Sequence, residues 1–190
     1  MFIDVCIPSG NEEEFVSMAE KLGTKAIMFL YKGKSPVIES KKVKIFYGKL
    51  GEGGVFSFTI GERKFVESKN SRFHYGFQEL EQKDSLHYRK SGINQVIGKL
   101  MKDKEKVLVI DVESFIVSKN VVKSLGRLKF NLEMAKKYDL NLVICSFASN
   151  PWNMRSSKDY ESLIRSLGYQ KEAKKATTML AYILKENSNL

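Results

Sequence analysis

Residues 2–30, FIDVCIPSGNEEEFVSMAEKLGTKAIMFL, contain two apolar runs separated by a polar, acid-rich segment. Phe2–Ile7 and Lys25–Leu30 are short and almost continuously apolar, which is typical of strands buried on both faces of a sheet. The segment between them is long enough for a helix, and strands that are joined through a helix pair in parallel. This opening therefore predicts an α/β fold.

Helix signals lie inside that segment. Asn11 is a candidate N-cap, and Glu14 follows three residues later, as in a capping box. Gly23 supplies a stop signal. The apolar residues that recur at helical spacing between these points are Phe15, Met18, Ala19 and Leu22. We therefore expect one helix between Asn11 and Gly23.

The same alternation returns in the second half of the chain. Two further buried strands are predicted at Lys106–Ile110 and Leu140–Phe147. The helices predicted around them are Ile93–Met101, Ser118–Tyr138, Ser157–Leu167 and Glu172–Lys185. The longest of these has an apolar stripe made of Val121, Leu125, Leu128, Leu132 and Ala135.

The middle of the chain is less regular. Val43–Tyr47 predicts a third strand. Val55–Ile60 alternates apolar and polar residues and, through a tight turn at residues 61 and 62, is predicted to form a hairpin with Lys64–Glu67. A helix is predicted over Arg72–Gln82.

Strands that alternate with helices predict either a doubly wound sheet or a barrel. A full barrel takes about 250 residues, so a barrel made from this chain would be trimmed. The irregular middle is where we place the missing element. No repeat, low-complexity tract or linker interrupts residues 1–190, which we expect to form a single domain.

The charge distribution indicates the class of partner. The chain has 32 Lys and Arg against 22 Asp and Glu, a net charge of +10. Residues 1–24 contain five of the acids and one of the bases, so the rest of the chain has 31 bases and 17 acids, or +14. This excess favours a polyanion, with nucleic acid first and an acidic membrane second, docking away from the first helix. A role in solubility alone is the alternative.

The cysteines and the apolar runs predict the compartment. Cys6 and Cys145 lie in apolar runs without metal-type spacing, and we expect buried thiols in a reducing compartment. The first residues lack the pattern of a signal peptide. No apolar run approaches the roughly 20 residues of a membrane span. We therefore expect a soluble, cytoplasmic protein with no membrane partner.

Residues suited to catalysis or metal binding are few. The two histidines, His74 and His87, are far apart, and no His-x-His or Cys-x-x-Cys pair occurs. Asp4, Asp111 and Glu113 lie at or just after strand ends, where barrel enzymes place ligands. A magnesium-dependent hydrolase is therefore one hypothesis, and carboxylates that cap helices or pair with lysines are the alternative.

Basic residues form clearer patterns. Lys119, Lys123 and Arg127 recur every four residues and predict a positive ridge on the long helix, with an ordinary solvated face as the alternative. Trp152, the sole tryptophan, precedes Arg155 by three residues in a loop after a buried strand. Such a loop can stack on bases and bind phosphates. A tryptophan that fills the core is the alternative.

Phe65–Arg72, Gly92–Met101 and Trp152–Gly168 resemble three motifs of the archaeal ribonuclease P protein component 3 family, which is related to the human p30-type subunit. The family motifs are a Val-Glu-Ser-Asn-x-x-Arg junction, a Gly-Ile-Asp-His turn with its helix, and a Trp-Asp-x-Arg-x-Pro-Arg-Asp-Leu element. The resemblance extends from about residue 64 to residue 185. Gln95 stands where the family has histidine, and Lys158 replaces the arginine of Pro-Arg-Asp.

The resemblance implies a trimmed TIM-like barrel, similar to the polymerase-and-histidinol-phosphatase (PHP) superfamily but without its metal chemistry. It implies a subunit that supports RNA-catalysed removal of 5′ leaders from precursor tRNA. Magnesium acts there with the catalytic RNA, and the protein itself binds no cofactor and has no catalytic residue. The implied partners are the ribonuclease P RNA, precursor tRNA and a protein subunit with an RRM-like fold. A PHP-like hydrolase and a general basic RNA scaffold are the competing hypotheses.

The expected RNA-binding residues come from two sources. Most occupy basic positions of the motifs, and the others belong to the basic ridge of the long helix. Together they are Arg72, Arg89, Lys99, Lys123, Arg127, Arg155, Lys158 and Lys174.

Overall fold

The strands form a parallel barrel. The computed structural model describes residues 1–79, 84 and 91–188. Seven strands pair in parallel, each with the next one along the chain: β1 (Asp4–Cys6), β2 (Ala26–Tyr31), β3 (Lys44–Leu50), β4 (Ser57–Ile60), β5 (Phe73–Tyr75), β6 (Val107–Asp111) and β7 (Asn141–Cys145). The chain beyond β7 returns to β1, because Cys6 bridges to Ala148 and the Phe147 N–H donates to the Val5 carbonyl at 2.8 Å. The predicted trimmed barrel is confirmed, with seven strands where a full barrel has eight.

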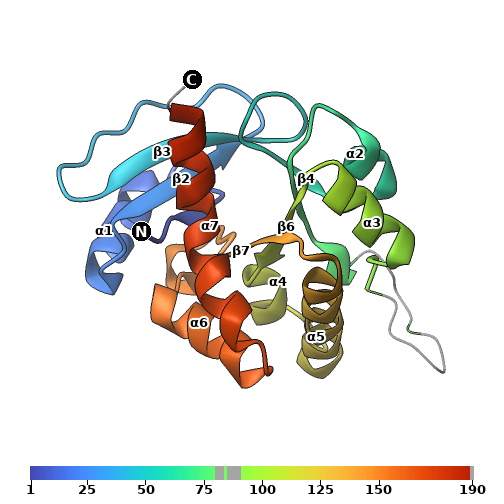
Figure 1. Ribbon diagram of the computed structural model, residues 1–190. Helices are drawn as coiled ribbons and strands as arrows, with labels where there is room; N and C mark the ends of the chain where they lie inside the picture. The colour runs from blue at the N-terminus through green and yellow to red at the C-terminus, as the bar shows by residue number, and fades with distance from the viewer. Residues whose placement is uncertain (80–83, 85–90, 189–190) are drawn as a thin grey trace.

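Helices pack around this barrel (Figure 1). They are α1 (Glu12–Leu22), α2 (Arg63–Glu67), α3 (Gln95–Asp103), α4 (Glu113–Ile116), α5 (Val121–Tyr138), α6 (Ser157–Ser166) and α7 (Gln170–Ser188), with 3-10 turns η1 (Phe77–Glu79) and η2 (Pro151–Asn153). Residues 32–43 and 51–56, which are all described, connect β2 to β3 and β3 to β4 without a helix. The trimming therefore lies in the middle of the chain, as predicted.

Two predictions for the middle of the chain are wrong. The expected hairpin of Val55–Ile60 and Lys64–Glu67 is instead β4 followed by α2, and β4 pairs in parallel with β3 and β5. The short helix carries the chain back across the sheet, which parallel pairing requires. The described part of Arg72–Gln82 forms β5 and η1, because Gly76 adopts a φ of 73°, which a helix cannot contain.

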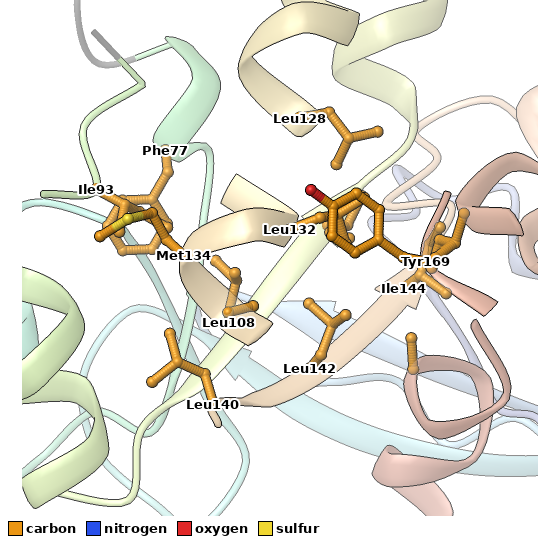
Figure 2. Close-up of a cluster of buried hydrophobic side chains, with 14 of the residues drawn as sticks. Phe77, Ile93, Leu108, Leu128, Leu132, Met134, Leu140, Leu142, Ile144 and Tyr169 are labelled. Carbon is orange, nitrogen blue, oxygen red and sulfur yellow. The ribbon is translucent and has the colours of Figure 1, made fainter. Parts of the chain in front are cut away.

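Alternate strand residues lie on opposite sides of the barrel wall. Val107 and Val109 of β6 belong to an inner cluster with Phe58 and Phe73, whereas Leu108 of the same strand belongs to an outer cluster. Figure 2 shows part of this outer cluster, with Phe77, Ile93, Leu108, Leu128, Leu132, Met134, Leu140, Leu142, Ile144 and Tyr169 labelled. Burial on both sides explains why the strand sequences are continuously apolar.

The second half of α7 covers one opening of the barrel. Leu180, Ile183 and Leu184 join the inner cluster together with Ala26 and Val107, the first residues of β2 and β6. In Figure 1 this helix, in red, lies across β7, against which it packs. The end where the strands begin is thus closed by α7, and the end where they finish is formed by loops.

The helix starts show one correction. Asn11 stands at the N-cap of α1, but its side chain makes no cap bond and accepts from the Ser9 N–H at 3.0 Å. The predicted capping box is therefore wrong for α1. A capping box does form at the start of α6, between Ser156 and Asp159. Gly23 ends α1 in the left-handed conformation, as predicted.

Gly61 follows β4 directly beneath a buried ring. A Cβ atom added at Gly61 would lie 2.6 Å from three carbons of Phe77, whose side chain is fully buried. Since that ring has no room to withdraw, Gly61→Ala is expected to lower the free energy of unfolding by about 2 kcal/mol in urea denaturation. Gly33→Ala is the control, because an added Cβ there meets nothing within 4 Å. Equal effects of the two substitutions would contradict this reading of Gly61.

Candidate nucleic-acid interface

The end of the barrel where the strands finish carries the tryptophan and several of the cationic side chains that the sequence predicts to bind RNA. Three segments meet there: η1 after β5, the α4–α5 elbow after β6, and the loop with η2 after β7. Parallel barrels normally place their binding sites at this end.

Trp152 is displayed on a constrained turn. Its side chain is 73% exposed, so the alternative of a core-filling tryptophan is wrong. Pro151 beside it is buried, and the Asn150 carboxamide oxygen accepts from the Trp152 N–H at 3.0 Å. The turn therefore holds the backbone of Trp152 in place while its indole faces solvent.

Glu113 ties this loop to α4. Its Oε1 accepts from the Ser149 N–H at 2.9 Å, the Ser149 hydroxyl at 3.0 Å and the Asn153 amide at 2.9 Å. The carboxylate that the sequence offered as a metal ligand is thus occupied in shaping the loop beneath Trp152.

Two of the predicted RNA-binding residues flank the tryptophan. The Arg155 side chain is exposed, and its Nη1 donates to the carbonyls of Trp152 at 2.8 Å and Met154 at 2.7 Å. Lys158 is exposed in the first turn of α6. Both cations therefore lie close to Trp152 along the chain, at the same end of the barrel.

A polar pocket lies in the elbow between α4 and α5. Its volume is about 470 Å³, and its lining includes Lys119, Lys123 and Arg127. A hydrogen-bond network forms its base: Gln78 Nε2 donates to Asp111 Oδ1 at 2.5 Å and to the Ser114 hydroxyl at 2.6 Å. The structure thus gathers the three cations around one pocket, although not as a ridge.

The predicted basic ridge is wrong in geometry. Lys119 precedes the helix, whose N-cap is Asn120, so it does not lie on the helical surface. Arg127 is 2% exposed and forms an ion pair with Asp84 at 2.8 Å. Its Nη1 also donates to the Gln78 carbonyl at 2.7 Å. Arg127 therefore serves the interior, which leaves it little surface to offer a phosphate.

Exposed aliphatic side chains border the same elbow. Val117 lines the pocket, and Val122 in the first turn of α5 is 79% exposed. Ile116 and Val121 are also exposed. The predicted apolar stripe therefore begins after Val121, which we had included in it. The sequence contains one signal for this patch: four aliphatic residues flank the polar segment Ser118–Asn120 at the start of the helix.

The other predicted RNA-binding residues do not converge on this end. Arg72, half-buried, lines a second pocket where β5 begins. Lys99 is exposed on α3 and Lys174 on α7. Arg89 lies outside the described residues. The structure therefore brings Lys123, Arg155 and Lys158 to one end of the barrel, with the buried Arg127 at the same pocket as Lys123, and it places Arg72, Lys99 and Lys174 elsewhere.

The carboxylates considered for magnesium do not assemble. Among the described residues, no group of three or more His, Cys, Asp or Glu is arranged to hold a metal ion. Asp4 Oδ1 accepts from the backbone N–H groups of Ser146 and Val5. Burial raises the pKa of Asp111 to about 6, against the opposing hydrogen bonds from Gln78 and its other donors.

His74 is buried on the outer side of the wall. Its Nδ1 lies 3.0 Å from the Thr59 hydroxyl, between β5 and β4. Burial, and then the charge of Lys106, lower its pKa to about 3. A neutral imidazole that bonds to a threonine joins two strands and is remote from the exposed end of the barrel.

None of the helices within the described part of the chain combines the length and apolarity needed to cross a membrane.

Known proteins with similar sequences support the resemblance stated from the motifs. No protein-family model matches the chain. The Ribonuclease P protein component 3 of Methanosarcina acetivorans is 33% identical over 86 residues, which are 44% of this chain and 36% of that protein. The chain thus matches little more than a third of the length of this relative. The predicted resemblance to the component 3 proteins is confirmed.

A solved structure supports the fold. A chain in the cryo-EM structure of archaeal Ribonuclease P with mature tRNA superposes with a TM-score of 0.80 at 18% identity, covering 99% of this chain and 92% of that one. A histidinol phosphate phosphatase from Lactococcus lactis aligns with a TM-score of 0.49 at 12% identity, covering 88% of this chain and 94% of that one.

Proposed function

We propose that this chain is an RNA-binding protein subunit of ribonuclease P and has no catalytic centre of its own. The observation that carries the proposal is the superposition of nearly the whole chain on a component of an archaeal ribonuclease P that was solved with tRNA. The local identity to component 3 proteins and the net charge of +10 point the same way. The excess of basic residues suits a partner of RNA, and the candidate carboxylates Asp4, Asp111 and Glu113 do not converge on one site within the described residues.

In the proposed complex the RNA, with its magnesium ions, removes the 5′ leader of precursor tRNA. The protein would organise the RNA through phosphate contacts and bind no cofactor. A protein subunit with an RRM-like fold would be its partner, and the exposed aliphatics of the α4–α5 elbow offer that partner a surface. The complex would work in the cytoplasm.

Reconstituted cleavage tests the proposal. Precursor tRNA would be incubated with the cognate RNA and the candidate partner subunit, with and without this chain, at moderate Mg²⁺ concentration. We expect the chain to restore leader removal and to cleave nothing when RNA is omitted. Tight RNA binding without any effect on cleavage would point to a general RNA scaffold. Turnover without RNA would point to a hydrolase.

Salt dependence tests the phosphate contacts. We expect the logarithm of the RNA-binding constant to fall linearly with the logarithm of the salt concentration. Lys158→Gln should reduce that slope by about one unit, since it removes one phosphate contact. Lys185→Gln is the control, because Lys185 is exposed on α7 near the closed end of the barrel. An affinity that does not depend on salt would contradict the proposal.

A further inference from the structure

Among the described residues, Trp152 is the most exposed aromatic side chain at the open end of the barrel. Trp152 is 73% exposed, although tryptophan gains more than most residues from burial. The turn beneath it is nevertheless held by two hydrogen bonds: the Trp152 N–H donates to the Asn150 side-chain oxygen, and Arg155 Nη1 donates to the Trp152 carbonyl. A rigid backbone that presents a bare indole loses little conformational entropy when a ligand covers the ring.

The surroundings of the indole indicate what kind of ligand would cover it. Its exposed neighbours along the chain are polar or charged: Ser149 and Asn150 before it, and Arg155, Lys158 and Asp159 after it. The carboxylate among them, Asp159, is engaged in the capping box with Ser156. A protein-docking face would surround the tryptophan with apolar side chains. Exposed apolar side chains of this kind cluster at the α4–α5 elbow. A lone aromatic ring beside cations matches an unpaired nucleotide, which offers a flat base and a phosphate.

We infer that the indole of Trp152 is a stacking platform for one unpaired base of an RNA, with Arg155 and Lys158 binding the adjoining phosphates. This inference rests on the proposed RNA-binding function and adds the kind of RNA recognised: a single-stranded stretch or a bulge, whose bases are free to stack. A continuous duplex hides its bases and offers only phosphates.

Acidic residues set the direction of approach. The first turn of α1 contains the exposed Glu13 and Glu14, and α1 packs against η2. A strand of RNA would therefore leave Trp152 on the side of Arg155 and α6, away from α1. Glu13→Gln and Glu14→Gln together should raise the affinity for RNA, because they remove repulsion without touching the base.

The test uses the sole tryptophan as its own reporter. The intrinsic fluorescence of the full chain would be followed while it is titrated with an oligouridylate of about ten nucleotides, a length within the range of known single-strand sites. We expect the single strand to quench the emission of Trp152 and to protect the indole from further quenching by acrylamide. The same strand paired to oligoadenylate should bind with little change in the emission.

Variants separate stacking from charge. Trp152→Leu keeps an apolar side chain but no ring, and should weaken single-strand binding roughly 5- to 150-fold with the salt slope unchanged. Trp152→Phe should retain most of the affinity. Tyr182→Leu is the matched control, since Tyr182 is 59% exposed on α7 near the closed end. Its substitution should leave the affinity unchanged.

Other results would overturn the inference. If the wild-type chain binds RNA with a steep salt slope while Trp152→Leu binds equally well, Trp152 is no stacking site although the proposed function stands. The same holds if Trp152→Leu weakens only the binding of the partner subunit, because the indole would then be a protein contact. If the wild-type chain binds no RNA at all, the proposed function fails and takes the inference with it.

Discussion

Arg127→Ala is expected to lower the free energy of unfolding by about 3 kcal/mol, because it breaks a buried ion pair from one side. The guanidinium is 2% exposed and bonds to Asp84 through Nε at 2.9 Å and Nη2 at 2.8 Å. It also donates to the Gln78 carbonyl at 2.7 Å. The substitution removes one donor from the Asp84 carboxylate and one from the buried Gln78 carbonyl, and the loss of hydrogen bonds at buried groups costs free energy. Urea denaturation followed by circular dichroism measures the loss.

Lys129→Ala is the matched control, because Lys129 lies on the same helix and is exposed. It should change the free energy of unfolding by less than about 0.5 kcal/mol. Under conditions where Arg127→Ala stays folded, we expect its salt slope of RNA binding to equal that of the wild type. The opposite pattern, normal stability with a slope lowered by about one unit, would make Arg127 the RNA contact predicted from the sequence.

The long buried strands could be predicted because each is covered on both sides. β2, β6 and β7 are continuous apolar runs, since one set of alternate residues fills the barrel and the other lies under helices. The helices between them follow from ordinary stop signals and apolar spacing. The parallel topology then follows from the alternation itself, because strands joined through helices run in the same direction.

One short strand, β5, could not be predicted, because its contacts come from distant residues. β5 has only three residues, and its outward residue is His74, a polar side chain paired with Thr59 of β4. In the sequence, Phe73 and Phe77 are four apart and match a helical stripe. The left-handed conformation of Gly76 divides this stretch into a strand and a turn. The presence of a glycine alone does not predict which conformation it adopts.

The candidate interface was half predictable. The Trp152 loop was located because an aromatic and a cation stand together after a strand, although exposure of the indole could not be read from the pattern. The burial of Arg127 could not be predicted, because its partner Asp84 lies 43 residues earlier in the chain. Spacing along a helix shows which side chains share a face, but it does not show which residues distant in the sequence contact that face.

Asp4 is the carboxylate that joins the first strand to the end of the last. Its Oδ1 accepts from the Ser146 N–H at 2.7 Å and the Val5 N–H at 3.0 Å. Burial raises its pKa to about 7 from 3.8, and the hydrogen bonds from Ser146 and Val5 only partly oppose this. Burial likewise raises the pKa of the neighbouring Cys6 and Cys145 thiols well above their ordinary values, so both stay neutral where Asp4 titrates.

The free energy of unfolding should therefore fall as pH rises between about 4 and 7. In that window the unfolded chain has already released the proton that folded Asp4 keeps, so folding takes up a proton and is favoured by acid. Each unit of pKa difference is worth about 1.4 kcal/mol. Asp111, whose pKa is also raised, adds a second contribution of the same sign up to its value of about 6.

Asp4→Asn should remove the Asp4 share of this fall, because the amide keeps the accepting oxygen and cannot ionise. Urea denaturation at several pH values should show that the free energy of unfolding of the variant, relative to that of the wild type, rises by about 3 kcal/mol between pH 4 and pH 7. Asp139→Asn is a control of opposite sign: hydrogen bonding from Lys102 and the charge of Lys175 lower the pKa of this exposed carboxyl. The φ of 46° at Asp139 also suits asparagine. That variant should lose stability relative to the wild type only above about pH 4. Parallel pH profiles for Asp4→Asn and the wild type would mean that the two backbone N–H groups keep Asp4 ionised despite its burial.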